Sequence, residues 1–101
     1  MGTRLDLQSK LEELLGSANV YYQPPESLKI KYPAIIFSKS KIDKDHANNS
    51  AYRLLTRYEL IVIDSRPDNQ VIQKLLALPY CSYDRQYKSD NLNHDSLTIY
   101  Y

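Results

Sequence analysis

The stretch YRLLTRYELIVIDSRPDNQVIQKLLALPY (Tyr52–Tyr80) decides the fold, because its hydrophobic pattern changes once from the period of a strand to that of a helix. In the first half, apolar residues occupy even positions: Tyr52, Leu54, Tyr58, Leu60 and Val62. After the turn DSRPDN, apolar residues recur at helical spacing as far as Pro79: Val71, Ile72, Leu75, Leu76 and Leu78. The sequence therefore predicts a long half-buried strand, a turn capped by Asp68 or Asn69, and a helix.

The odd positions of this strand are only partly polar. Arg53, Arg57 and Glu59 alternate as expected for a solvated face, but Leu55, Ile61 and Ile63 interrupt them. Either the last third of the strand is covered on both faces, or its odd face meets another subunit. Both interpretations stay open at this point.

The rest of the chain supplies a sheet and a second helix around this stretch. A Leu stripe ending at Gly16 predicts a helix, and residues 20–23 predict an edge strand, since Pro24 and Pro25 follow. Residues 34–38, which follow Pro33, are rich in β-branched and aromatic side chains and predict a strand. Residues 39–50 are rich in turn formers, which predicts a projecting hairpin tip. Further strands are expected near residues 82–87 and 94–101, with a turn at 89–91 between them.

This order predicts a single α+β domain over residues 1–101. The elements run α-β-β-β-α-β-β, with an antiparallel sheet of four to five strands, an extended β-hairpin and two helices packed on the sheet. A chain of 101 residues with a net charge of +1 fits one small domain and argues against a dedicated polyanion binder. Its aromatic residues are ten Tyr and one Phe, which suits half-buried positions and subunit interfaces.

The sequence contains no recognisable catalytic or cofactor motif. The two glycines, Gly2 and Gly16, are too few for a phosphate-binding loop, and no GxSxG motif is present. Cys81 is the only cysteine, and neither His46 nor His94 has a partner at metal-ligand spacing. The pattern indicates a structural protein without enzymatic activity, cofactor or metal. The charged N-terminal segment and the lack of a long apolar run predict a soluble protein with no membrane partner.

A nucleic-acid-binding module is an alternative function of a different class. Basic residues lie on or near the predicted hairpin and could form one surface: Lys39, Lys41, Lys44, Arg53, Arg57 and Arg66. Acidic residues are interspersed among them, and the Tyr positions do not match the signature of an RNA-recognition sheet. An ordinary mixed-charge sheet face explains the same residues.

Three segments together resemble a known family. They are YPAIIF, the hairpin segment DKDHANNSAYRLLTRYELIVIDSRPDN, and the ending LPYCSYDRQYKSDNLNHDSLTIYY. In order and character, from about Leu5 to Tyr101, they are similar to the tail terminator or tail-completion proteins of long-tailed bacteriophages. The resemblance implies an α+β subunit that forms a ring, commonly a hexamer, at the head-proximal end of the tail tube. Such a ring stops tube polymerisation and joins the tail to the head connector; head-completion proteins of the same virions are the alternative.

The resemblance carries no residue-level motif, so the contact residues are inferred from the sequence pattern. We expect one interface patch at Leu55, Ile61 and Ile63, and a second at Tyr83, Tyr87, Tyr100 and Tyr101. The hairpin tip would contact a neighbour or the tube through Lys41, Ile42, Lys44 and His46. Arg53 and Arg57 would face the lumen, where passing DNA is attracted without sequence preference. The expected location is the virion tail, after assembly in the bacterial host cytoplasm.

Overall fold

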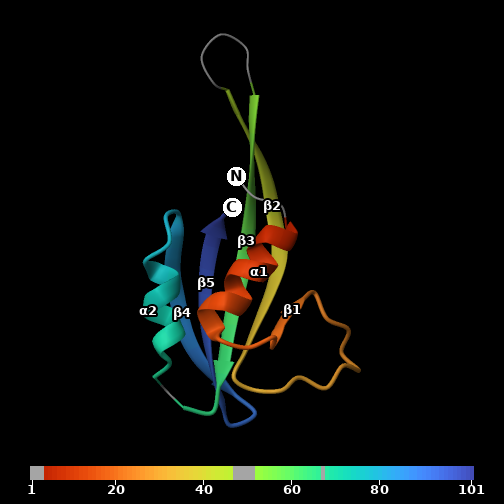
Figure 1. Cartoon of the computed structure of the whole chain (residues 1–101), viewed down its shortest axis with the longest axis vertical. Coiled ribbons are helices and arrows are strands. Elements are labelled where there is room, and N and C mark those ends of the chain that lie inside the picture. Colours follow the sequence, from red (N-terminus) through yellow and green to blue (C-terminus); the bar gives the residue numbers. More distant parts are fainter. Residues whose placement is uncertain (1–3, 47–51, 67) are drawn as a thin grey trace.

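The computed structural model describes residues 4–46, 52–66 and 68–101 (Figure 1). The elements are α1 (Arg4–Leu15), β1 (Val20–Tyr22), β2 (Ala34–His46), β3 (Tyr52–Asp64), α2 (Gln70–Leu76), β4 (Cys81–Ser89) and β5 (Leu92–Tyr100). This order confirms the predicted α+β class. The five strands form one sheet in the order β1-β2-β3-β5-β4.

The strand β3 is the centre of the sheet. It pairs antiparallel with β2 on one side and with β5 on the other, so that Leu60 lies between Phe37 and Leu97. β4 completes one edge by pairing antiparallel with β5. β1 forms the other edge, as expected from the two prolines after it, but it runs parallel to β2.

Both helices cover the same face of the sheet (Figure 1). The core therefore lies between this face and the helices, and the even positions of β3 point into it. The buried cluster consists of Leu7, Leu11, Val20, Ile35, Phe37, Tyr58, Leu60, Val62, Val71, Leu75, Leu97 and Ile99. Full burial of each such aliphatic side chain contributes about 1.5–3 kcal/mol of hydrophobic free energy.

Local sequence determines where these elements end. Gly16 ends α1 with a φ of 80°, a conformation that glycine adopts without a steric penalty. The β4–β5 connection is a two-residue turn in which Asp90 and Asn91 have φ of 53° and 62°, the geometry of a type I′ hairpin. Asn is one of the residues that tolerate positive φ, which explains why the turn falls here.

The helix α2 is shorter than the apolar pattern predicts. It ends at Leu76 with Ala77 as its C-cap, before Pro79. Of the predicted stripe, Val71 and Leu75 are buried, whereas Leu76 is 42% exposed. The helix is only seven residues long, so its buried side is narrower than the sequence pattern suggests.

The long strands β2 and β3 continue beyond the sheet as a two-stranded ribbon, which we call the arm (residues 41–46 and 52–56). β5 pairs with β3 only from Arg57 onward, and β1 pairs with β2 only over Ile35–Phe37. The arm strands pair with each other, and Tyr101 N adds one hydrogen bond of 3.1 Å to Thr56 O. The arm projects from one end of the molecule (Figure 1).

The arm confirms the predicted extended hairpin and corrects its boundaries. Residues 39–46, which the sequence analysis assigned to a turn-rich tip, are strand as far as His46. The polar composition misled the prediction, because backbone pairing with a partner strand can form a strand without apolar side chains. The rest of the predicted tip, residues 47–50, lies outside the described residues.

A hydrogen-bond network at Asp64 joins the end of β3 to the start of α2. Asp64 is 4% exposed, and its Oδ1 accepts from the Arg66 backbone N–H at 3.2 Å. Its Oδ2 accepts from the Arg66 guanidinium at 3.2 Å and from the Asn69 amide at 2.7 Å. Asn69 in turn caps α2, because its Oδ1 accepts from Val71 N at 2.9 Å. One carboxylate therefore orients the cap residue of the following helix.

This network lowers the pKa of Asp64. Burial acts to raise that pKa, but the hydrogen bonds from Arg66 and Asn69 and the charge of Arg66 outweigh burial. A lowered pKa in the folded state means that the ionised carboxylate stabilises the fold. This contribution is present above the unfolded pKa of about 3.9 and is lost as the pH falls through the lower folded pKa.

We expect Asp64→Ala to lower the free energy of unfolding by about 1–3 kcal/mol at neutral pH, because the Asn69 amide and the turn lose their acceptor. Urea denaturation measures this difference. The exposed Asp68→Ala in the same turn is the matched control and should change stability by less than about 0.5 kcal/mol. The gap between wild type and Asp64→Ala should narrow as the pH falls below about 4; a gap independent of pH would contradict a role for the charged carboxylate.

Candidate assembly surface

The helices leave one face of the sheet uncovered, which we call the open face. The strand register aligns one row of residues across all five strands on this face: Tyr21, Ile36, Ile61, Ser96 and Arg85. Ile36 and Ile61 lie at its centre and are both partly exposed. The predicted interface residue Ile61 is therefore on a surface that no helix covers.

A second row on the open face runs from Ala34 through Ile63 and His94 to Tyr87. The Tyr87 and His94 rings are stacked with centroids 4.9 Å apart, and the Arg85 guanidinium lies 5.0 Å from the Tyr87 ring centroid. Ile63 is only 5% exposed. The prediction that Ile63 contributes to a subunit contact is corrected here, because the chain itself already covers most of this side chain.

Polar groups border the apolar centre of the open face toward the arm. Thr98 Oγ1 donates to Asp84 Oδ2 at 2.8 Å, and Glu59 is exposed between Ser38 and Thr98 in the register. Arg57 Nε donates to Ser40 Oγ at 3.0 Å, at the bulge that marks the base of the arm. An apolar centre with a polar margin is the usual composition of a protein interface.

The four tyrosines predicted to form one patch lie in different places. Tyr83 is on the helix side of β4, and Tyr87 is on the open face. Tyr101 packs partly against the core, while Tyr100 pairs with Arg57 in the β3–β5 register. These tyrosines were expected to share one patch, but alternation along β4 and β5 separates them. They do not form a single interface patch.

Of the predicted contact residues in the arm, Ile42 has a described side chain and is 53% exposed. Lys41, Lys44 and His46 lie in β2, and Arg53 and Leu55 lie in β3. The backbone register pairs Asp43 with Leu55 and Asp45 with Arg53. The side chains of these arm residues, apart from Ile42, lie outside the described part of the structure.

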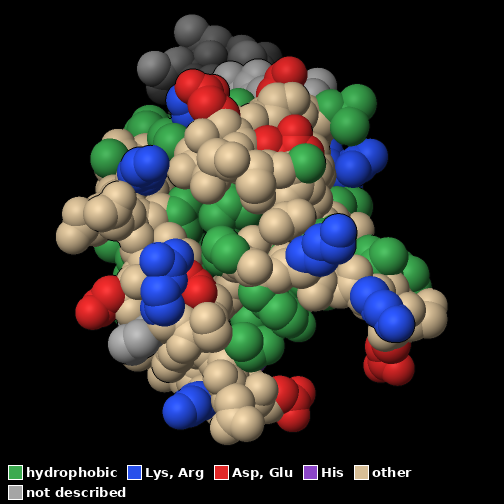
Figure 2. Space-filling model, turned by 60° about the horizontal axis from the view of Figure 1, so that its bottom comes forward, with side chains coloured by type: hydrophobic (Ala, Val, Ile, Leu, Met, Phe, Trp, Pro, Cys, Tyr) green, Lys and Arg blue, Asp and Glu red, His purple; other side chains and the backbone are tan. Residues whose placement is uncertain are grey.

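The helix side carries a groove that the sequence analysis missed. This helix-side groove has a volume of about 970 Å³ and lies between the end of α1, α2 and the strands β4 and β5. Its lining includes Leu14, Leu15, Arg66, Asp68, Ile72, Lys74, Leu76, Tyr83, Gln86 and Asp95. Figure 2 views the end of the molecule opposite the arm and shows hydrophobic side chains surrounded by Lys, Arg, Asp and Glu side chains.

A buried acid lies in this groove. Asp95 is 6% exposed, and the Tyr83 hydroxyl donates to its Oδ1 at 2.7 Å. This hydrogen bond raises the pKa of Tyr83 to about 12, with smaller contributions from burial and from the charge of Asp95. The sequence did contain a signal for Asp95, since it shares the odd positions of β5 with Leu97 and Ile99 and so is an acid on the buried face.

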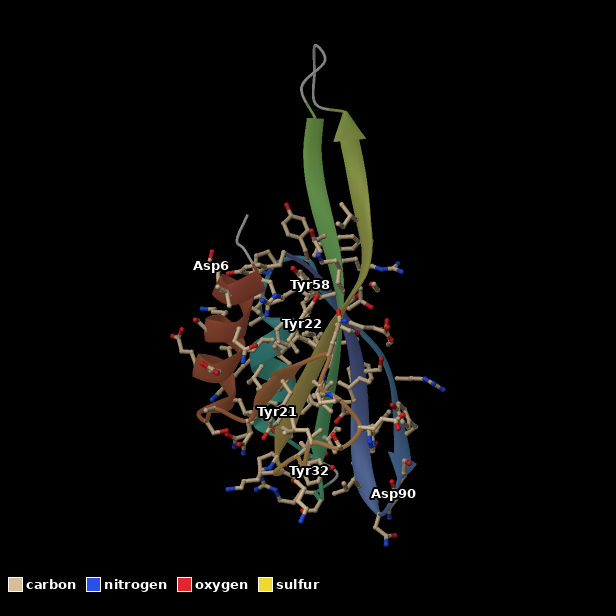
Figure 3. All side chains as sticks on the ribbon, turned by 90° about the vertical axis from the view of Figure 1, so that its right-hand side faces the viewer. Asp6, Tyr21, Tyr22, Tyr32, Tyr58 and Asp90 are labelled. Atoms are coloured by element: carbon tan, nitrogen blue, oxygen red, sulfur yellow. The ribbon has the colours of Figure 1, made fainter. Side chains whose placement is uncertain are left out.

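An aromatic cluster holds the base of the arm against α1. Tyr58 is 4% exposed, and its ring lies 6.0 Å from that of Phe37, which lies 4.9 Å from that of Tyr22. The Arg4 guanidinium lies 4.5 Å from the Tyr22 ring centroid. Figure 3 shows Tyr22 and Tyr58 between α1 and the sheet. Burial, followed by the neighbouring Tyr22, raises the pKa of Tyr58.

The structure separates Arg66 from Arg57, two basic residues of the nucleic-acid alternative, and it also separates Cys81 from His94. Arg66 pairs with Asp64 at the end of β3 remote from the arm, so it does not join Arg57 in a basic surface. Cys81 packs partly against the core, whereas His94 lies on the open face. Burial and then the charge of Asp84 raise the pKa of the Cys81 thiol, which favours the less nucleophilic thiol form.

The described part of the chain contains neither a metal-binding cluster nor a membrane-spanning helix. Among the residues whose side chains the structure describes, no three His, Cys, Asp or Glu gather closely enough to hold a metal ion. Neither described helix has the length and apolar character needed to cross a bilayer.

Comparison with known proteins provides no family for this chain. Neither a scan against protein-family models nor a search of curated proteins gives a match. A function for this chain must therefore be inferred from the open face, the arm and the helix-side groove.

We expect Tyr83 to titrate at a pH of about 12. The difference in tyrosinate absorbance between wild type and Tyr83→Phe measures this titration. In an Asp95→Asn background the midpoint should fall toward the usual value of about 10, because the phenol loses its anionic acceptor. Because the folded pKa is raised, the hydrogen bond stabilises the fold below pH 10 and its contribution is lost as the pH rises through 12. An unchanged midpoint in Asp95→Asn would contradict the assigned hydrogen bond.

Proposed function

We propose that this protein is a structural subunit of a long-tailed bacteriophage virion, a tail terminator that assembles as a ring at the head-proximal end of the tail tube. The arm is the observation that carries the proposal. Its strands extend past β5 and β1 and contribute nothing to the described hydrophobic core. A two-stranded ribbon is only marginally stable alone in water, so contact with a partner explains why the chain retains it.

The open face provides a second surface of different character. Ile36 and Ile61 lie side by side in the register and are partly exposed within a polar margin. A closed ring needs two unlike surfaces on each subunit, since every copy contacts the next head to tail. The arm and the open face satisfy this requirement, and the resemblance to tail terminators supplies the virion context.

The proposed partners follow from this role. They are further copies of the chain in a ring, by resemblance a hexamer, together with the tail tube protein and the head connector. Recognition would depend on complementary surfaces and would need no cofactor or catalysis. Arg57 is the described residue that could lie near passing DNA, although its Nε is hydrogen-bonded to Ser40. Any attraction to DNA would be weak and independent of sequence. The protein would act in the virion after assembly in the host cytoplasm.

The direct test mixes the purified protein with polymerising tail tube protein. We expect rings in negative-stain images and tubes that become shorter as the protein concentration rises, because a bound ring stops growth at one end. Tubes of unchanged length, together with a monomer in light scattering, would rule out the proposed role. Rings that bind the head connector but leave tube length unchanged would instead indicate a head-completion protein.

A substitution on the open face distinguishes an effect on folding from an effect on ring assembly. We expect Ile61→Asp to remain folded, with a loss of about 1 kcal/mol or less in unfolding free energy, because Ile61 is partly exposed. It should nevertheless fail to form rings, since a carboxylate would be buried in the contact without a partner. Circular dichroism and light scattering measure the two effects. The adjacent core variant Leu60→Asp is the control and should unfold, because Leu60 is fully buried; normal rings from Ile61→Asp would exclude the open face as a contact.

A further inference from the structure

The two outer edges of the arm have no strand partner among the described residues. β5 pairs with β3 no further than Arg57, and β1 pairs with β2 no further than Phe37. β2 and β3 nevertheless pair with each other as far as His46 and Tyr52. Each outer edge of the arm therefore presents backbone N–H and C=O groups that a further strand would satisfy.

Strand alternation identifies which backbone groups point outward. Thr56 O accepts from Tyr101 N at 3.1 Å, so the backbone of Thr56 faces the β5 side of β3. Alternate residues of a strand face the same side, and two residues directly opposite in an antiparallel pair face either toward or away from each other. Ile42 is opposite Thr56, so it faces away from β3. The outward backbone groups of the arm therefore belong to Ile42, Lys44 and His46 on β2 and to Tyr52, Leu54 and Thr56 on β3.

The direction and the level of these edges indicate which strand completes them. A strand that continues the β5 ladder along β3 runs in the direction of β5, and this is also the direction of β2, because both are antiparallel to β3. The ladder of β5 ends with Tyr101 at Thr56, and Thr56 is also the residue opposite Ile42. The arm half of β2 thus begins at the level where β5 stops. When the arms of a ring point the same way, β2 of the neighbouring copy has both the direction and the level required.

We propose that the arms of adjacent copies pair edge to edge, with residues 42–46 of β2 in one copy hydrogen-bonded to residues 52–56 of β3 in the next. This assignment rests on the proposed function, since it identifies the surface that the arm contacts in the ring. The contact is heterologous: each copy offers its β2 edge to one neighbour and its β3 edge to the other. Closure of the ring then leaves no arm edge unpaired. Joined arms also gain the additional strands that a two-stranded ribbon lacks for stability.

Edge pairing of the arms is compatible with contact through the open face. The register shifts between Lys39 and Lys41 at the base of the arm, and a bulge bends and twists a strand pair. The arm edges are therefore turned relative to the edges of the sheet. The same neighbour can then meet the arm at its edge and the sheet at its open face.

Amide hydrogen exchange in the assembled protein tests the pairing at single residues. We expect the N–H groups of Lys44 and Leu54 to exchange at least about tenfold more slowly than in an unstructured peptide, because each gains an acceptor in a neighbouring arm. The control is the N–H of Lys88. Ser89 and Leu92 face each other across the two-residue turn, so Lys88 faces the outer edge of β4 and should exchange at nearly the unstructured rate.

The outcomes separate this proposal from the proposed function. Slow exchange at both arm positions supports edge pairing. Exchange of both arm amides at the unstructured rate, in a preparation that light scattering shows to be oligomeric, overturns edge pairing and leaves ring formation standing. A strict monomer in light scattering that also leaves tail tubes unchanged overturns both.

Proline substitution provides an independent readout. We expect Leu54→Pro to weaken self-association by about tenfold or more, because proline removes an N–H that faces the neighbouring arm and takes no part in pairing with β2. The control Lys88→Pro removes an outward N–H from the β4 edge and should leave the association constant nearly unchanged. Analytical ultracentrifugation measures both constants, and circular dichroism verifies folding.

Lys44→Pro makes the corresponding change on the β2 edge. It should weaken association to a similar extent, and it replaces Leu54→Pro in the comparison if that variant does not fold. Association constants equal to that of Lys88→Pro would exclude edge pairing of the arms.

Discussion

The mismatch in length between β3, with 13 residues, and its neighbour β5, with 9, is the constraint on which the rest of the structure depends. β3 is paired on both sides from Arg57 to Ile63, where its even residues build the core beneath the helices. Beyond Arg57, β5 ends and only β2 continues beside it. A single strand thus contributes to two structures with different requirements, a packed sheet and a projecting two-stranded ribbon (Figure 1).

The two edges of the sheet are protected in ways that favour contact through faces rather than edges. β1 has three residues and is followed by Pro24 and Pro25, which have no backbone N–H to offer a new strand. β4 is longer, but its register shifts between Tyr83 and Arg85, and Asp84, Arg85 and Lys88 are exposed along it. Bulges and charges discourage uncontrolled strand addition. With both edges protected, the surfaces left for specific contact with a partner are the open face, the groove and the arm.

The sequence predicted those parts of the fold in which a local pattern has only one physical solution. The alternation around Leu60, the glycine at the end of α1 and the Asn69 cap each specify their structure through nearest neighbours along the chain. The order of elements and the fold class followed from these. Predictions failed where position in three dimensions decides, as at Ile63, which its own chain covers, and at the tyrosines that strand alternation separates. The groove could not be predicted, because its lining comes from two helices and two strands that meet only after folding.

The bulge between Lys39 and Lys41 lies where the sheet ends and the arm begins. Ser40 at this point accepts a hydrogen bond from Arg57 Nε and donates one of 3.1 Å to the Arg57 carbonyl oxygen. A bulge bends and twists a strand pair, so these two residues fix the angle at which the arm leaves the sheet. In a head-to-tail assembly that angle fixes the rotation from each copy to the next. If the chain forms the proposed ring, the number of its subunits would follow from the position of one extra residue in β2 as well as from the contacts between copies.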